Sequence, residues 1–167
     1  MSRVFYLLLA FAVVALTPAR AQQAAAKPEL QIDIPVQPKA SKVVFNMSHP
    51  AFAGDQPIGL MQMQLMVRYY AEHQTPLEVV AVFHGAAGYM LLNDQAYDRA
   101  RKSAKGNPYR EQIAALQQAG VQFEECGQTA RSNGWTNVDL LPGVKVDVGA
   151  NLRLVQLMQD GFVQLQP

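Results

Sequence analysis

The stretch "LEVVAVFHG", residues 77 to 85, decides the fold class of this chain. From Val79 to Phe83 every residue is apolar, and β-branched valines recur. A continuous apolar run of this kind is typical of a strand that is buried on both faces in a parallel sheet. His84 and Gly85 end the run. The stretch therefore predicts a buried strand whose carboxyl end carries an imidazole and a glycine.

Further short apolar runs surround this strand along the chain. We expect strands over four other ranges: 42–48, 121–126, part of 139–149, and 162–166. Helical patterns lie between the runs, and this alternation is typical of an α/β domain. The sequence therefore predicts a three-layer sandwich around a mostly parallel five-stranded sheet with right-handed crossovers. It forms one domain over residues 42–167, and no second domain is expected.

The expected helices follow from periodicity and from helix-ending residues. The ranges are 57–74, 86 to about 101, 107–120 and 150–160. In the third helix Asn107 is expected as the N-cap with Pro108 in the first turn, and the inner face holds Ile113 and Leu116. Glycines are expected to end the last two helices, at Gly120 and Gly161.

The first of these helices has an unusually narrow polar stripe. Its regular polar positions are Gln64, Arg68 and Glu72. A single sheet covers only one side of such a helix. Either another subunit covers part of the remaining surface, or the chain's own loops do. That surface holds Met61, Met63, Met66, Tyr69 and Tyr70. The first alternative predicts a homo-oligomer that replacement of Met63 and Met66 with Glu would dissociate.

The amino-terminal residues have the pattern of an export signal. Arg3 precedes an uncharged apolar run from Val4 to Leu16, and Ala19-Arg20-Ala21 fits the small-x-small pattern that signal peptidases cleave. A membrane anchor is the alternative, but a spanning helix needs about 20 apolar residues and Pro18 comes too early. We therefore expect residues 1–21 to be a signal peptide, with no membrane attachment after cleavage, and a periplasmic or secreted protein.

Residues 22–41 are expected to form an extended arm or linker, because prolines recur among alanine and glutamine. Leu30, Ile32, Ile34 and Val36 alternate with a period of two, so the arm could instead lie along a sheet or a neighbouring subunit.

The formal charge of +1 and the 16% of charged residues argue against a nucleic-acid partner, which would require clustered Lys and Arg.

Small polar and reactive groups follow three of the expected strands. In sheets of this class, ligands bind at the carboxyl ends of the strands, beside a switch in strand order. The residues expected at that edge are Asn46, Ser48, His49, His84, Gly85, Cys126 and Gly127, with Thr129 close behind. This edge is the predicted site, and no cofactor is expected there.

Three stretches resemble the DsrE/DsrF-like family of small sulfur-relay proteins, in an exported branch. They are "VVAVFHG", "GVQFEECGQTARSNGW" and "DLLPGVKVDVGANLRLVQLMQDGFVQLQP". The most specific parts are the Cys-Gly-x-Thr at Cys126 to Thr129, the "DLLPGV" at Asp139 to Val144, and the closing Gly161-Phe162. The resemblance implies a flavodoxin-like sandwich, assembly into dimers, trimers or hexamers, and a cysteine that carries sulfur as a persulfide. Partners would then be small sulfur species or a protein that donates or accepts sulfur.

Cys126 is the chain's one cysteine, so it has no disulfide partner within the chain. A helix that starts at Gly127 would favour negative charge on its sulfur, whereas Glu124 and Glu125 would disfavour it unless Arg131 turns back over the site. Two interpretations stay open. Cys126 binds or relays sulfane sulfur, or it is a buried structural cysteine in a non-catalytic binding or assembly module.

His84 could accept the thiol proton or orient a sulfur donor, although a histidine at a strand end is more often structural. No metal site is expected from His84, Cys126 and His49, because no pair has the local spacing of metal ligands. A basic stretch between Arg99 and Arg110 could attract sulfur oxyanions or a partner, but a solvated loop is the simpler explanation.

Overall fold

A five-stranded sheet lies at the centre of the computed structural model, which describes residues 29–167. Its strands are β1 (Ser41–Met47), β4 (Leu77–Phe83), β5 (Val121–Cys126), β6 (Lys145–Asp147) and β7 (Val163–Leu165). Their order is β6-β5-β4-β1-β7, and every neighbouring pair is parallel. The stretch that opens with Leu77 is therefore the central strand, and the predicted parallel α/β fold is confirmed.

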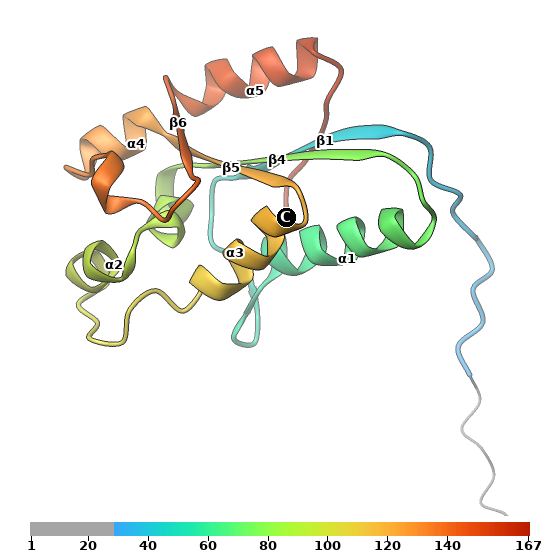
Figure 1. Cartoon of the computed structure of the whole chain (residues 1–167), viewed down its shortest axis with the longest axis horizontal. Coiled ribbons are helices and arrows are strands. Elements are labelled where there is room, and N and C mark those ends of the chain that lie inside the picture. The colour runs from blue at the N-terminus through green and yellow to red at the C-terminus, as the bar shows by residue number, and fades with distance from the viewer. Residues whose placement is uncertain (1–28) are drawn as a thin grey trace, which may run out of the picture. The chain divides into compact units, whose positions relative to one another are not determined.

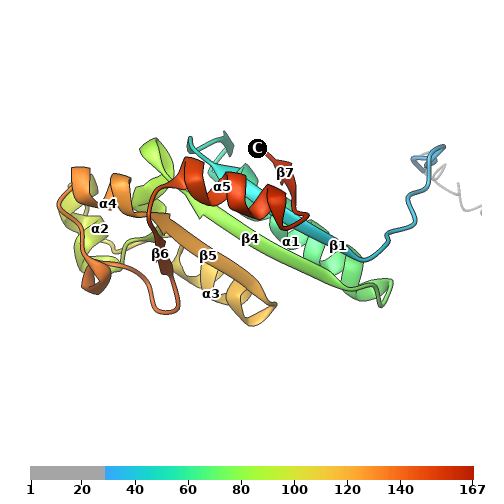
Figure 2. The ribbon, with the colours of Figure 1, turned by 90° about the horizontal axis from the view of Figure 1, so that it is seen from above.

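Helices cover both faces of this sheet (Figure 1). The helices α1 (Ile58–Glu72) and α3 (Arg110–Gln118) pack on one face, and α5 (Ala150–Gln159) packs on the other. Figure 2 shows α5 crossing above the sheet, which carries the chain from the β6 edge back to β7 beside β1. The strand order therefore reverses at β1, and the carboxyl ends of the strands lie next to this switch point.

The single helix expected over residues 86–101 is divided into two helices in the structure. The structure has a 3₁₀ helix, η1 (Gly85–Leu91), and a separate helix, α2 (Asp94–Arg101). Leu92 between them is extended and bridges to Leu140. Asn93 then caps α2, since its Oδ1 accepts a hydrogen bond from the Ala96 N–H at 2.9 Å. A side chain that favours caps thus starts a new helix inside the apolar pattern.

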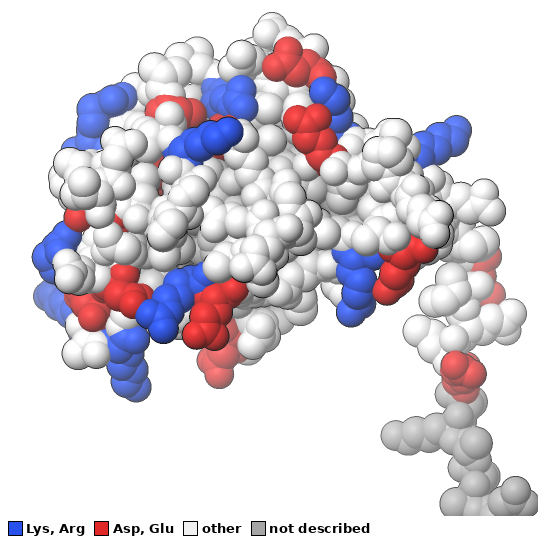
Figure 3. Space-filling model, in the orientation of Figure 1, with Lys and Arg blue, Asp and Glu red and all other residues white. Residues whose placement is uncertain are grey.

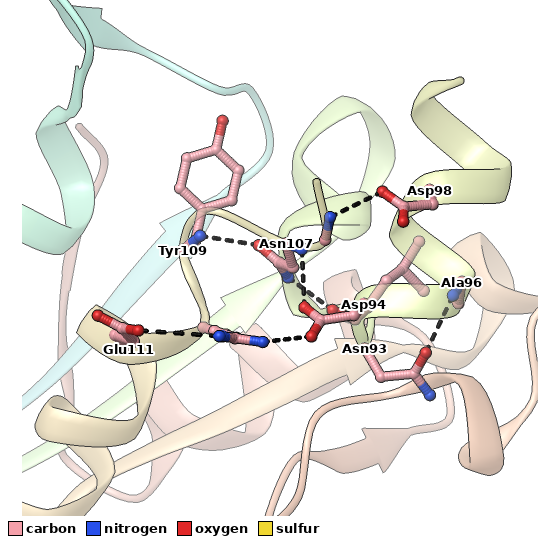
Figure 4. A network of polar contacts seen from close by, with 10 residues as sticks. Asn93, Asp94, Ala96, Asp98, Asn107, Tyr109 and Glu111 are labelled. Atoms are coloured by element: carbon pink, nitrogen blue, oxygen red, sulfur yellow. Dashed lines mark hydrogen bonds and ion pairs between the residues drawn. The ribbon is translucent and has the colours of Figure 1, made fainter. Parts of the chain in front are cut away.

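The helix α3 begins at Arg110, three residues after the expected N-cap at Asn107. The Oδ1 of Asn107 still accepts a hydrogen bond from the N–H of Tyr109 at 2.9 Å, as a cap would. Its Nδ2 points inward and donates to the carbonyls of Met90 at 2.8 Å and Leu92 at 2.5 Å. Figure 4 shows Asn107 inside a polar network that joins the end of η1 to the loop between α2 and α3. Two buried carbonyls that η1 leaves without helical partners thereby gain a donor. The inner face of α3 is as predicted, with Ile113 and Leu116 buried.

A short hairpin occupies the region that the sequence indicated as a loop between the first strand and the first helix. Its strands are β2 (Phe52–Ala53) and β3 (Gln56–Pro57), which pair antiparallel. Gly54 has a φ of +60°, in the left-handed region that favours glycine at tight turns.

The surface of α1 differs from the one expected for a subunit contact. Met63 is 0% exposed, and Met66 packs against the same core. The hydroxyl of Tyr70 donates to the Oγ of Ser41 at 3.1 Å. The domain itself therefore covers most of this helix, and Leu65 and Tyr69 are its exposed large apolar residues. Replacing Met63 with Glu would bury a charge and unfold the domain, so it cannot test for an oligomer.

The expected signal peptide and residues 22–28 of the expected arm lie outside the described residues. In the described part of the arm, Leu30, Ile32 and Ile34 are exposed and form no strand. No helix in residues 29–167 is both long and apolar enough to cross a bilayer.

Candidate functional site

A pocket of about 420 Å³ lies where β4 and β5 end and α5 begins. The predicted residues that line it are His84, Gly85, Cys126 and Thr129, and residues 149–152 close another side. The topology thus brings together groups from the ends of β4 and β5, because neighbouring parallel strands end at the same edge of the sheet. The first residues of α5 also line the pocket, which the sequence did not predict.

Cys126 is the last residue of β5 and the N-cap of the short helix α4 (Gly127–Ser132). Its side chain is only 4% exposed and forms part of the pocket wall. The Sγ atom accepts a hydrogen bond from the N–H of Ala150 at 3.3 Å. Ala150 is the first residue of α5, so the positive end of that helix faces the sulfur. The helix expected to favour negative charge at Cys126 was α4, whereas the amide that reaches it belongs to α5.

Gly127 allows the strand that follows to approach closely. A Cβ at this position would lie 2.4 Å from the carbonyl oxygen of Asp147 in β6, closer than real contacts allow. Arg131 turns back toward this place, since its Nη2 donates to the carbonyl of Val148 at 3.3 Å. Gly127 therefore contributes through packing beside Cys126, and it is not among the residues that line the pocket.

Thr129 joins α4 to the start of η1. Its Oγ1 accepts a hydrogen bond from the N–H of Gly85 at 2.9 Å. Gly85 has a φ of +56°, a conformation that glycine adopts without steric cost. The sequence pattern suggested that Thr129 would bind a sulfur species. In the structure its oxygen already holds the turn after β4, and the hydroxyl proton remains available as a donor to the pocket.

His84 is half-buried, and its Nε2 lies 2.7 Å from the Oδ1 of Asn46 at the end of β1. Burial, followed by the charge of His49, lowers the pKa of His84 below its ordinary value of 6.5. The ring is therefore neutral at pH 7 and able to accept a proton. Asn46 contacts the ring from behind and does not line the pocket.

His49 also lies outside the pocket lining, on an exposed position after β1. Its Nδ1 is 2.8 Å from the Oγ of Ser48. Gln166 lies beside Ser48, because its Nε2 donates to Ser48 Oγ at 3.3 Å. Sequence reasoning missed Gln166 as a site residue, although it is the last residue of the strand predicted over residues 162–166 and so belongs to the carboxyl edge of the sheet.

The two glutamates before Cys126 point to opposite faces of the sheet. Glu124 lies on the Cys126 side and forms two hydrogen bonds of 2.7 Å with the guanidinium of Arg153. Glu125 lies on the other side, is fully buried and has no hydrogen-bond partner. Burial first, then the charges of Cys126 and Asp147, raise the pKa of Glu125 to about 9. At pH 7 Glu125 is thus uncharged and Glu124 is paired, so the repulsion expected from both is largely absent.

Asp147 lies opposite Cys126 in the β5–β6 register. Burial and then the charge of Glu124 raise the pKa of Asp147. The N–H groups of Gly127 and Gly149 act in the opposite direction, although neither reaches the carboxylate in hydrogen-bond geometry.

Within residues 29–167, no group of three or more His, Cys, Asp or Glu side chains is arranged to hold a metal ion.

The basic stretch between Arg99 and Arg110 is largely neutralised. Arg99 contacts Asp139 at 2.6 Å, Arg110 pairs with Asp94, and the guanidinium of Arg101 lies 4.3 Å from the ring centre of Tyr89. Figure 3 shows acidic and basic side chains interspersed over the visible face. Three of the basic side chains in this stretch therefore contact α2 or the segments packed against it.

The "DLLPGV" motif lies away from the pocket and has a structural role. The side chain of Asp139 accepts from the N–H of Thr136 at 2.9 Å, and the N–H of Leu141 donates to the carbonyl of Leu91 at 2.8 Å. Gly143 has a φ of +77°. This segment fastens the chain between α4 and β6 to the end of η1. By contrast, the Cys-Gly-x-Thr motif lies at the pocket.

The chain that carries these motifs was compared with known protein families and solved structures. The model of the DsrE/DsrF-like family matches residues 41–167. The chain belongs to this family. No curated protein sequence matches the DsrE-like chain. Two solved structures share its fold. A protein of unknown function from Methanobacterium thermoautotrophicum is 21% identical with a TM-score of 0.59, covering 76% of this chain and 99% of its own. The ychN protein from E. coli is 16% identical with a TM-score of 0.54, covering 75% and 99%.

Proposed function

We propose that this DsrE-like protein binds or relays sulfane sulfur as a persulfide on Cys126. The observation that carries the proposal is the position of the sulfur, in the wall of a pocket and within hydrogen-bond distance of the first amide of α5. That amide favours negative charge on the sulfur. Membership in a family generally related to sulfur relay supports the same chemistry.

The step needs a donor that carries a sulfur–sulfur bond, such as a persulfide or polysulfide. The Cys126 sulfur attacks the outer sulfur of the donor, and a new S–S bond forms as the donor S–S bond breaks. The bonding electron pair leaves with the donor sulfur as a thiolate. The thiol proton goes to a neutral base in the pocket and then to the departing thiolate. His84, which lines the same pocket, is the candidate for this base. Transfer to an acceptor thiolate repeats the exchange in reverse.

Incubating the reduced protein with inorganic polysulfide should add one sulfur mass to the wild type. The Cys126→Ala variant should gain none and should keep its fold, because losing one small thiol costs about 1 kcal/mol. Intact-protein mass spectrometry measures the addition, and circular dichroism checks the fold. An unmodified wild type together with an unfolded Cys126→Ala variant would show that the cysteine is core packing.

A second candidate function is a non-catalytic binding or assembly module with a structural cysteine. The specific observation in its favour is the 4% exposure of Cys126, which packs in the core cluster between the sheet and α5. The two candidates differ in thiol accessibility. Titrating the native protein with a small thiol reagent should modify Cys126 if it serves the pocket, and should leave it unmodified if it only packs.

We also propose that the protein is exported, on the basis of Arg3, the apolar run to Leu16 and the Ala19-Arg20-Ala21 site. The mature chain should then begin at or near Gln22. Intact-mass analysis of the protein from the periplasmic or secreted fraction measures this directly. Recovery of chains that retain residues 1–21 in that fraction would contradict cleavage.

A homo-oligomer is proposed on a surface different from the one that the sequence suggested. The outward side of α5 carries apolar residues among its polar ones, with Leu152 67%, Val155 49% and Met158 45% exposed. The solvent face of a helix in a monomer is normally polar. Light scattering should give a mass above that of one chain, and Val155→Glu should lower it. The control is Gln159→Glu, an exposed change near the end of the same helix. A monomeric wild type at micromolar concentration would remove the proposal.

A further inference from the structure

Four hydrogen bonds link His84 to His49 through Asn46, Gln166 and Ser48. The ring Nε2 of His84 lies 2.7 Å from Asn46 Oδ1, and Asn46 Nδ2 donates to Gln166 Oε1 at 3.5 Å. Gln166 Nε2 then donates to Ser48 Oγ at 3.3 Å. Ser48 Oγ in turn lies 2.8 Å from His49 Nδ1. The series connects β1, the residue after β4, and the segment that follows β7.

The three hydrogen bonds from His84 to Ser48 run in one direction. An amide nitrogen only donates and an amide oxygen only accepts. Because the nitrogen of Asn46 is committed to Gln166, its oxygen faces His84, and the ring Nε2 must supply the proton. A neutral imidazole has one N–H, so the Nδ1 of His84 carries a lone pair. No described residue forms a hydrogen bond with this Nδ1, and His84 lines the same pocket as Cys126.

We propose that Asn46 and Gln166 are positioning residues that hold His84 in the Nε2–H tautomer. The Nδ1 atom then takes the thiol proton of Cys126, directly or through one water, and returns it to the thiolate that leaves the donor. The proton-transfer part rests on the proposed function, whereas the tautomer is a property of the protein alone. The chain's penultimate residue thereby acts on a strand end that lies 120 residues earlier in the sequence.

The tautomer can be measured without any sulfur donor. Long-range nitrogen–proton correlation spectra of ¹⁵N-labelled protein at pH 8 distinguish the two neutral forms of each histidine. The wild type should show His84 as the Nε2–H form. Asn46→Ala should give a mixture of both forms, and Gln166→Ala should shift His84 in the same direction. Gln164→Ala is the matched control, because Gln164 lies on β7 outside the hydrogen-bond series and should change nothing.

The rate of sulfur uptake from inorganic polysulfide supplies the second readout. Asn46→Ala and Gln166→Ala should each slow it. Asn46→Ala, which removes the direct contact with the His84 ring, should slow it by about 2-fold or more, in proportion to the loss of the Nε2–H form. An Nδ1–H form in the wild type, or Gln166→Ala behaving like Gln164→Ala in both readouts, would overturn the proposal. An Nε2–H form that Gln166→Ala disturbs, in a protein that takes up no sulfur, supports the positioning by Gln166 and contradicts the proposed function alone.

Discussion

Replacing Arg153 with Met should destabilise the domain by about 3 kcal/mol, because it leaves a buried carboxylate without its partner. Glu124 is 3% exposed and receives both of its guanidinium hydrogen bonds from Arg153. The arginine side chain is itself 23% exposed, so the loss should fall at the lower end of the range for buried pairs. Asp147 adds to the effect, since the charge of Glu124 already raises its pKa. Urea denaturation at pH 7 measures the loss.

The double variant separates the cost of an unpaired charge from the value of the pair. Replacing both partners, as Glu124→Leu with Arg153→Met, should restore most of the lost stability, since neither member of the pair is then left as an unpaired charge. Arg68→Met is a suitable control, because Arg68 is an exposed arginine whose pairing with Glu72 is loose, at 3.8 Å. A loss below 1 kcal/mol for Arg153→Met would show that water reaches Glu124 in solution.

The strands were the part of the fold that the sequence predicted best. The run from Val79 to Phe83 has no polar residue and repeats β-branched valines, which is typical of a strand buried on both faces, and it is the centre of the sheet. β5 ends at Cys126 as expected, since the Gly127 that follows starts a helix. Parallel order then places all the strand ends at one edge. The position of the pocket therefore followed from local patterns and one topological rule.

Contacts between distant segments could not be predicted in the same way. The amide of Ala150 reaches the sulfur of Cys126 only because α5 crosses to the other face of the sheet. Asn107 looked like a helix cap, and it became an internal donor because η1 leaves carbonyls open beside it. One signal was available and was missed. The alternation in "VQFEEC" puts Glu125 on the same face as Val121 and Phe123, which are both core residues.

Because its carboxyl group lies on the core face of β5, Glu125 is the strongest expected source of pH dependence in the stability of the domain. Its pKa in the folded protein is about 9, against 4.5 as its ordinary value. Between these values the folded state holds a proton that the unfolded chain releases, so stability falls as pH rises. Each pKa unit corresponds to about 1.4 kcal/mol, so roughly 3 kcal/mol should be lost between pH 4.5 and pH 7. The loss should continue to about pH 9 and then level off.

Glu125→Gln should remove this loss, because the amide has nearly the same shape and does not titrate. Below pH 4.5 the free energies of unfolding of the two proteins should be similar, since both then bury a neutral polar group beside Gly88 and Thr129. At pH 7 the variant should be more stable by roughly 3 kcal/mol. Glu111→Gln, on the exposed side of α3, should follow the wild type at every pH. Urea denaturation from pH 4.5 to pH 9 gives the three curves. A Glu125→Gln curve parallel to that of the wild type would mean that Glu125 is ionised in the native protein and has found a partner.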